Sequence, residues 1–417
     1  MPAIALAIAS GCSGGGGSTP PAVSPPPAAP SGVLDTSYGA AGVAVLPPGA
    51  GMAVDAAGDV FYAGFQFGKL DPSGRPALFE QNAVLAGYAP TIAVDSAGNL
   101  YAASVVNDSL IQVVKRDASG RPVGSFGQDG HVDLAFAGSV GLRTILLDGV
   151  GNVYVMASTH PPNFPRPVNV YLIKLDSAGK PVATFGADGT GRITLPSVFE
   201  IATPVPAIDR AGNVFAVAPS FSGNVLVQKL DANGAPAADF ATMEIGLGCT
   251  GVPNVPYTIR RFISVDASDN VFVGGACAYG AETRERPFVV KLDARGNLAA
   301  SFGEGGIARD FYAAKNAAGT LQPTAVDAFV PASDGNLYVG VSTKDLECGV
   351  GVGIVKLGAD GRPVDGFGSH GVAMVELYAG AAWNLGIDGM MRLYAGGNPR
   401  TACPAVAGGG AIYRFNG

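Results

Sequence analysis

Side chains able to hold a ligand occupy one repeated position in this chain. A hairpin signature recurs, made of an apolar run, Asp-x-x-Gly-Asn and a second apolar run, and Arg143, Arg261, Asp327 and Trp383 each lie five residues before its turn position. Asn384 follows the tryptophan directly. Arginine offers a forked pair of donors and tryptophan a flat stacking face, so this set predicts a site for an anionic or sugar-like ligand. In the alternative, the two arginines pair with Asp327 or with backbone carbonyls and merely fill the space.

The elements that would position these residues are short strands. The hairpin occurs seven times, with successive turns 40 to 66 residues apart. The second strands open at Asp59, Asn99, Asn152, Asn213, Asn270, Asn336 and Arg392. Each hairpin is followed by a third run ending in a polar turn, such as Ile173 to Asp176, and most units then show Phe-Gly-x-x-Gly, as at Phe126 to Gly130. Four strands in each of seven units predict an all-β, seven-bladed β-propeller with four antiparallel strands per blade.

The two ends of the chain complement each other. The seventh unit stops after its third strand, Tyr413 to Asn416, and a segment of the fourth-strand type, Leu34 to Val43, lies near the front instead. We therefore expect residues 34–46 to join the C-terminal blade and close the ring, which removes the open edge of a linear stack of sheets. The propeller would span residues 34–417.

The run from Leu34 to Gly42, LDTSYGAAG, together with the downstream Asp-x-x-Gly-Asn hairpins, resembles the delta-60 type repeats of bacterial β-propellers, which are related to NHL-like repeats. The resemblance covers residues 34–417 and implies the propeller fold but no particular reaction. Departures occur after Phe79 and Phe240, where the glycine pair is missing, and at Ala332, which replaces a turn Asp. Residue types that return in most units are expected to serve the fold: the third-strand Lys, the turn Asp and the Phe-Gly pair.

The strand order of a blade places its loops on two faces of the disc. The first-to-second and third-to-fourth turns are short and uniform, whereas the second-to-third loops and the connections between blades are long and irregular, for example Thr159 to Val168 and Asn398 to Gly410. Residues five positions before the turn would ring the mouth of the central channel on this irregular face. Because irregular loops carry most binding functions, we expect a protein or glycan partner there.

Four cysteines are expected on the same irregular face. Cys249 lies in a connection between blades, and Cys277, Cys348 and Cys403 lie in second-to-third loops. Disulfides between neighbouring loops, Cys249 with Cys277 and Cys348 with Cys403, would suit an oxidising envelope. Free thiols are the main alternative, and a zinc site is disfavoured because no C-x-x-C or H-x-x-x-H spacing occurs.

The first 33 residues have a different composition. Residues 1–11 are mostly apolar and read as an export signal, and Ala9-Ser10-Gly11-Cys12 resembles the lipobox of bacterial lipoproteins. Residues 12–33 would then be a lipid-modified Cys12 followed by a Gly/Ser/Pro-rich tether. Since no Lys or Arg precedes Lys69, we expect the signal to extend upstream of Met1. In the alternative, Cys12 is an ordinary cysteine of an unstructured leader. The lipoprotein reading predicts a cell-envelope protein held at the outer membrane by its lipid alone, periplasmic or surface-exposed.

The net charge and the available side chains disfavour several classes of function. A net charge of −7 without a basic run argues against nucleic acid as a partner. The enzymatic alternative is a metal-dependent lyase or lactonase-like hydrolase in the channel, but the expected mouth supplies only Asp327 and Asn384 as ligands. His131, His160 and His370 have no partner by spacing, and no nucleophile motif occurs. We therefore expect a binding scaffold for a protein or glycan, with no cofactor, no metal and no assigned catalytic residue.

Overall fold

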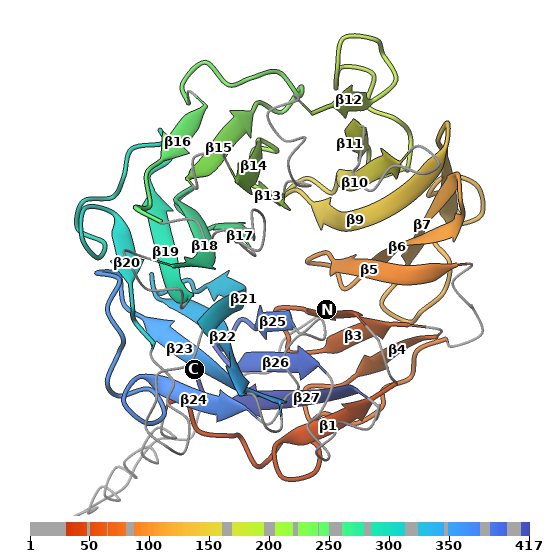
Figure 1. Cartoon of the computed structure of the whole chain (residues 1–417). Coiled ribbons are helices and arrows are strands. Elements are labelled where there is room, and N and C mark those ends of the chain that lie inside the picture. The colour runs from red at the N-terminus through yellow and green to blue at the C-terminus, as the bar shows by residue number, and fades with distance from the viewer. Residues whose placement is uncertain are drawn as a thin grey trace, which may run out of the picture.

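The chain folds into seven antiparallel sheets arranged as the blades of a β-propeller around a central axis (Figure 1). The computed structural model describes residues 31–47, 51–64, 66–80, 87–160, 169–195, 205–219, 224–240, 242–249, 261–278, 285–312, 324–345, 349–375, 384–397 and 410–417. Six sheets have four strands, and the first blade has three within the described ranges. The expected fold class is confirmed. In the described part of the chain, no helix has the length and apolar character needed to cross a membrane.

Strands of equivalent position repeat from blade to blade. The inner strands are β2 (Gly51–Val54), β5 (Tyr88–Val94), β9 (Ser139–Leu147), β13 (Val205–Ile208), β17 (Arg261–Val265), β21 (Thr324–Pro331) and β25 (Asn384–Ile387). The second strands are β3 (Val60–Ala63), β6 (Leu100–Asn107), β10 (Val153–His160), β14 (Val214–Pro219), β18 (Val271–Cys277), β22 (Leu337–Asp345) and β26 (Leu393–Gly397). The third strands are β4 (Phe67–Leu70), β7 (Leu110–Arg116), β11 (Asn169–Leu175), β15 (Val225–Leu230), β19 (Arg286–Leu292), β23 (Gly349–Leu357) and β27 (Gly410–Phe415). The outer strands are β8 (His131–Ala135), β12 (Arg192–Thr194), β16 (Met243–Ile245), β20 (Ile307–Arg309), β24 (Val372–Val375) and β1 (Val43–Leu46).

The hydrophobic core is divided among the interfaces between blades. Seven clusters of buried side chains occur, and each joins two neighbouring blades. Second strands are covered on both faces by their neighbours, so every residue of β18 is buried. This explains why the second runs are nearly continuous in apolar residues instead of alternating.

The turn aspartates bind their own hairpins. In the second blade Asp95 Oδ1 accepts hydrogen bonds from the backbone N–H groups of Ala97 and Asn99, at 3.0 and 2.9 Å, and Asn99 Nδ2 donates to Asp95 Oδ2 at 2.8 Å. Gly98 supplies the positive φ of 76° that the turn requires. The Asp-x-x-Gly-Asn signature is therefore a turn motif, as expected.

A second repeated unit stacks a cation on two aromatic rings. In the third blade Tyr154 meets Phe185 edge to face at 5.9 Å, and Lys174 Nζ lies 5.0 Å from the tyrosine ring and donates to Ala232 O of the next blade at 2.9 Å. Equivalent ring pairs are Phe61–Phe79, Tyr101–Phe126, Phe215–Phe240, Phe272–Phe302, Tyr338–Phe367 and Tyr394–Tyr38. The repeated Lys and Phe thus serve the fold, as expected.

The residue after each Phe ties one blade to the next. Gly127 N donates to Ala178 O at 2.8 Å, and Gly186 N donates to Asn233 O at 2.9 Å. A side chain at Gly127 would place its Cβ 2.1 Å from His131 O, and its φ is +60°, so glycine is needed there. The glycine of the Phe-Gly pair thus connects neighbouring blades through its backbone N–H.

The ring closes through a turn that both chain ends build together. β1 pairs with β27, with Val43 opposite Tyr413. Gly32 N donates to Asn416 O at 2.6 Å and Asn416 N donates to Val33 O at 3.0 Å, which are the bonds that Gly74 and Asp71 make in the first blade. Closure by the N-terminal strand is confirmed, and residues 31–33 also bond to the ring at this seam.

Arg414 fastens this seam. Its guanidinium pairs with Asp35 Oδ2 at 2.6 Å, donates to Ser37 Oγ at 3.1 Å and to Pro72 O, and lies 4.6 Å from the Tyr38 ring. Its side chain is only 3% exposed. One arginine thus joins the C-terminal strand, the N-terminal segment and the first blade.

The seam is expected to weaken in acid. Burial opposes ionisation of Asp35, but hydrogen bonds from Ser37 and the pairing with Arg414 outweigh it and lower the pKa of this carboxyl below its ordinary value of 3.8. A lowered folded-state pKa means that the contribution to stability is complete well above pH 3.8 and is lost as the pH falls through the folded value. Urea unfolding from neutral to acid pH should show a smaller decline for Asp35→Asn than for the wild type; equal slopes would contradict this.

The sixth blade lacks one acceptor that its equivalents possess. In the third blade the Tyr154 hydroxyl lies 3.3 Å from Asp148 Oδ2, whereas Ala332 stands at the turn position of the sixth blade. The Tyr338 hydroxyl there is buried and interacts with Lys356, a donor, and no acceptor for its own O–H group is described.

Ala332→Asp is therefore expected to raise the free energy of unfolding by about 1 kcal/mol, because it supplies the missing acceptor. The turn already has the required backbone geometry, with Ala332 N bonded to Asn336 O at 2.9 Å. Urea unfolding measures the gain. In a Tyr338→Phe background the gain should shrink, and an equal gain there would refute the explanation.

Candidate functional site

The inner strands carry β-bulges at the level where sequence spacing predicted a ring of functional residues. The residues five positions before each turn are called the mouth ring here; the structure describes Pro90, Arg143, Arg261 and Asp327 of it. In β9, Leu142 pairs with Ala157 and Thr144 with Met156, so Arg143 is the extra residue. In β21, Val326 pairs with Val341 and Ala328 with Gly340, so Asp327 is the extra residue.

A third bulge lies in β5. Tyr88 pairs with Val105 and Thr91 with Ala103, which leaves Ala89 and Pro90 opposite one residue. Bulges re-aim side chains, and they are frequent beside binding sites. In the part of the chain that the structure describes, β5, β9 and β21 therefore change register at the mouth ring. Sequence spacing gives no signal for them, because a bulge is defined by the pairing of two strands.

Arg143 is oriented by a buried hydroxyl of its own blade. Its Nε and Nη2 groups donate to Ser158 Oγ at 3.2 and 3.1 Å, and Ser158 is fully buried in β10. Arg143 itself is exposed to solvent. These hydrogen bonds run to Ser158, and no bond from Arg143 to Asp327 is described.

The surroundings of Arg143 favour an anion. Partial burial lowers the pKa of its guanidinium, and no acidic side chain in the described ranges offsets this loss of hydration. The side chain as a whole remains exposed, and no negative charge in the described ranges neutralises it. An anion bound there would form charge-assisted hydrogen bonds with the guanidinium.

The structure describes the other candidate residues in less detail. Asp327 is 6% exposed. Arg261 opens β17 opposite Gly275, with its backbone alone described. Asn384 opens β25, pairs with Gly396 and is half-buried. Trp383 and Cys12 lie outside the described residues. No contact that joins two members of the mouth ring is described.

A disulfide holds the irregular face. Cys249, which follows β16, is bonded to Cys277 at the end of β18, with the Cα atoms 5.7 Å apart. This is the pairing of neighbouring loops that the sequence suggested, and it connects the fourth blade to the fifth. Cys348 and Cys403 lie outside the described residues.

Replacing both Cys249 and Cys277 by Ser is expected to lower the free energy of unfolding by about 3–4 kcal/mol, because the bond closes a loop with a sequence separation of 28. Guanidinium unfolding measures the loss. Reductant should shift the wild-type midpoint more than that of the double variant. Equal shifts in both proteins would refute the assignment.

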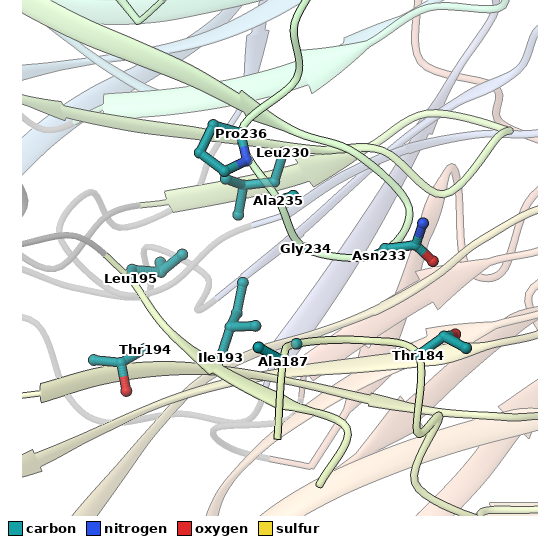
Figure 2. A pocket seen from close by; sticks show the side chains of 11 residues that line it. Thr184, Ala187, Ile193, Thr194, Leu195, Leu230, Asn233, Gly234, Ala235 and Pro236 are labelled. Atoms are coloured by element: carbon teal, nitrogen blue, oxygen red, sulfur yellow. The ribbon is translucent and has the colours of Figure 1, made fainter. Parts of the chain in front are cut away.

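A separate cavity lies away from the mouth ring, between the third and fourth blades. Its volume is about 450 Å³, and Figure 2 shows side chains beside β12 facing the turn that follows β15. The lining residues are Thr184, Gly186, Ala187, Ile193, Thr194, Leu195, Leu230, Asn233, Gly234, Ala235 and Pro236. None of these is charged, so the cavity holds no acid, base or metal ligand.

Sequence reasoning missed this cavity although a signal was present. Lys174 N donates to Gly191 O as Lys115 N donates to Gly130 O, so the two glycines are equivalent. The segment from Phe185 to Gly191 is therefore two residues longer than that from Phe126 to Gly130. The longer loop accompanies the opening between the blades.

Within the described ranges, no three His, Cys, Asp or Glu side chains gather in a way that could hold a metal ion. His131 opens the outer strand β8, and His370 lies just before the outer strand β24. Both belong to the periphery of the disc, as expected.

The fold defines the class of protein: a seven-bladed β-propeller. No family model matches the sequence, and no curated protein matches it either. Among solved structures, the chain is similar to the β-propeller domain of Nup133 from Vanderwaltozyma polyspora, at 11% identity over 89% of this chain and 97% of that chain, with a TM-score of 0.46.

Two enzymes are also similar in fold. An ulvan lyase is 9% identical over 89% of this chain and 94% of its own, with a TM-score of 0.47. An α-L-arabinofuranosidase from Fusarium graminearum is 12% identical over 78% of this chain and 91% of its own, with a TM-score of 0.44. At these identities the likeness is one of fold and says nothing of ligand or reaction.

Proposed function

We propose that this protein is a cell-envelope lipoprotein whose propeller is a binding scaffold, and that it takes an anionic protein or glycan partner at the mouth ring through Arg143. The observation that carries this proposal is the state of Arg143. The residue is exposed, stands on a bulge, is oriented by Ser158, and has no acidic partner in the described ranges. A charge-assisted contact of this kind contributes about 1.5–3 kcal/mol.

The seam supports an arrangement in which the tether leaves the propeller on the face opposite the irregular loops. Ser31 lies in a third-to-fourth turn, where its carbonyl accepts a hydrogen bond from Gly368 N at 2.9 Å. Arg143 and Asp327 of the mouth ring lie near the middle of β9 and β21, so they are set back from the face that carries the third-to-fourth turns. A lipid on Cys12 would therefore attach to the face opposite the irregular loops, and a ligand would reach the mouth ring from the side of those loops.

Binding is tested with the full chain and immobilised polyanions, polygalacturonate and dextran sulfate, with uncharged dextran as reference. The wild type should bind a polyanion, and Arg143→Gln should weaken binding about tenfold or more. Arg362→Gln is the matched control, because Arg362 is an exposed arginine in a third-to-fourth turn whose described hydrogen bonds use only its backbone N–H and carbonyl. Equal binding by Arg143→Gln and the wild type, or no binding to either polyanion, would overturn the proposal.

The anchor is tested separately. Labelled fatty acid should be incorporated by the wild type and not by Cys12→Ser, which should leave the membrane fraction. Absence of label in the wild type would overturn the lipoprotein part and leave the binding part standing.

A further inference from the structure

The guanidinium group of Arg143 has two edges, and one is already occupied. Each edge presents two roughly parallel N–H donors, one through Nε and Nη2 and the other through Nη1 and Nη2. In this structure Ser158 Oγ accepts both bonds of the first edge, at 3.2 and 3.1 Å. The second edge has no partner among the described residues.

The position of Ser158 fixes this orientation. Ser158 is fully buried in β10, and its backbone pairs with Gly141 of the inner strand. Neither the strand nor the hydroxyl can move far. Because Arg143 is the extra residue of the bulge, its side chain follows a direction set by the bulge and by Ser158 together. The two bonds to Ser158 thus restrain the orientation of the guanidinium, and with it the direction of the open edge.

Neutral polar residues occur next to Arg143 in the chain and on the neighbouring inner strand. Thr144 follows Arg143 in β9, and Thr91 of the neighbouring β5 accepts a hydrogen bond from Ile145 N at 3.3 Å. Asn384 occupies the position of Thr144 in the seventh blade, with the first and second blades between it and the third. Hydroxyl and amide groups suit the hydroxyls of a sugar ring, because each can both donate and accept.

We infer that the open edge of Arg143 receives a carboxylate in bidentate fashion, so that the ligand is a uronate-bearing glycan and Ser158 is the positioning residue that sets its angle. This inference rests on the proposed function of anion binding at the mouth ring. A planar carboxylate matches two parallel donors, whereas a tetrahedral sulfate is satisfied by charge from many angles.

Selectivity among polyanions tests the inference with the full chain. Polygalacturonate should bind more tightly than dextran sulfate or polyglutamate. Arg143→Lys keeps the charge but not the fork, so it should lose polygalacturonate binding about tenfold, as Arg143→Gln does, while retaining much of its weaker affinity for dextran sulfate. Ser158→Ala should lower the ratio of polygalacturonate to dextran sulfate affinity, a change that a purely structural role would not produce.

The outcomes distinguish a failure of the proposed function from a failure of the carboxylate assignment. If no polyanion binds in an Arg143-dependent manner, the proposed function fails. If binding depends on Arg143 but Arg143→Lys matches the wild type, or dextran sulfate matches polygalacturonate, the proposed function stands and the carboxylate assignment is overturned. Preference for polyglutamate would overturn the glycan assignment and point to an acidic protein. Arg143→Lys changes an exposed residue, so the test does not depend on the folding of Ser158→Ala.

Discussion

Removal of residues 31–46 is expected to destroy the single cooperative unfolding transition of the propeller. These residues complete the seventh blade with β1, bury Tyr38, Ala44 and Leu46 between the seventh and first blades, and supply Asp35 to Arg414. Losing that burial together with the buried ion pair costs on the order of 5–10 kcal/mol, which is comparable to the whole stability of a typical domain. Calorimetry and urea unfolding of a variant that begins at residue 47 provide the measurement.

The matched control is a variant that begins at residue 31. It keeps the whole seam, including the bonds from Gly32 to Asn416 and from Gly368 to Ser31. Its transition should coincide with that of the full chain. If both shortened variants unfolded like the full chain, the ring would not depend on its seam, and the energetic role given to β1 would be wrong.

Arg414→Met is expected to lower the free energy of unfolding by about 3 kcal/mol, because it leaves the partly buried carboxylate of Asp35 without its partner. Methionine keeps much of the volume over the Tyr38 ring, so the loss reports on charge and hydrogen bonding more than on packing. Urea unfolding at neutral pH measures it.

A double-mutant cycle with Asp35→Asn isolates the pair. The double variant should be less destabilised than the sum of the two single variants, since the uncompensated carboxylate is removed. Lys174→Met in the third blade is a useful comparison, because Lys174 occupies the equivalent position and pairs with a carbonyl rather than a carboxylate. Additive effects of Asp35→Asn and Arg414→Met would contradict a coupled pair.

Much of the fold could be predicted because the same hairpin signature occurs seven times in the sequence. The turn Asp, the third-strand Lys and the Phe-Gly pair each make the same contact in blade after blade. Such a contact requires the same residue type at the same spacing, which can be recognised in the sequence. The contacts of Ser31 and Gly32 with the ring were not expected, because both residues lie in a Gly/Ser/Pro-rich stretch. The signal was available, since Ser31-Gly32 matches Ser73-Gly74 of the first blade and Ser119-Gly120 of the second.

The candidate site was predictable in position but not in geometry. Counting back from the turn placed Arg143 and Asp327 at the same level of the ring. That both are extra residues of bulges depends on how β9 and β21 pair with their neighbours, and a single sequence does not encode such a shift locally. The contact between Arg143 and Ser158 joins residues on two strands across a bulge, so neither spacing nor residue type could indicate it.

The split turn at the seam makes the point at which the chain enters the ring arbitrary, while the order of the blades around the ring stays the same. Asn416 and Gly417 occupy the first two positions of a four-residue turn, and Ser31 and Gly32 occupy the last two, in the places that Asp71 to Gly74 hold in the first blade. A peptide bond from Gly417 to Ser31 would therefore need no linker. The same ring is compatible with a circular permutant opened at another third-to-fourth turn, such as 176–179. The architecture of the seven blades therefore does not depend on where the termini lie.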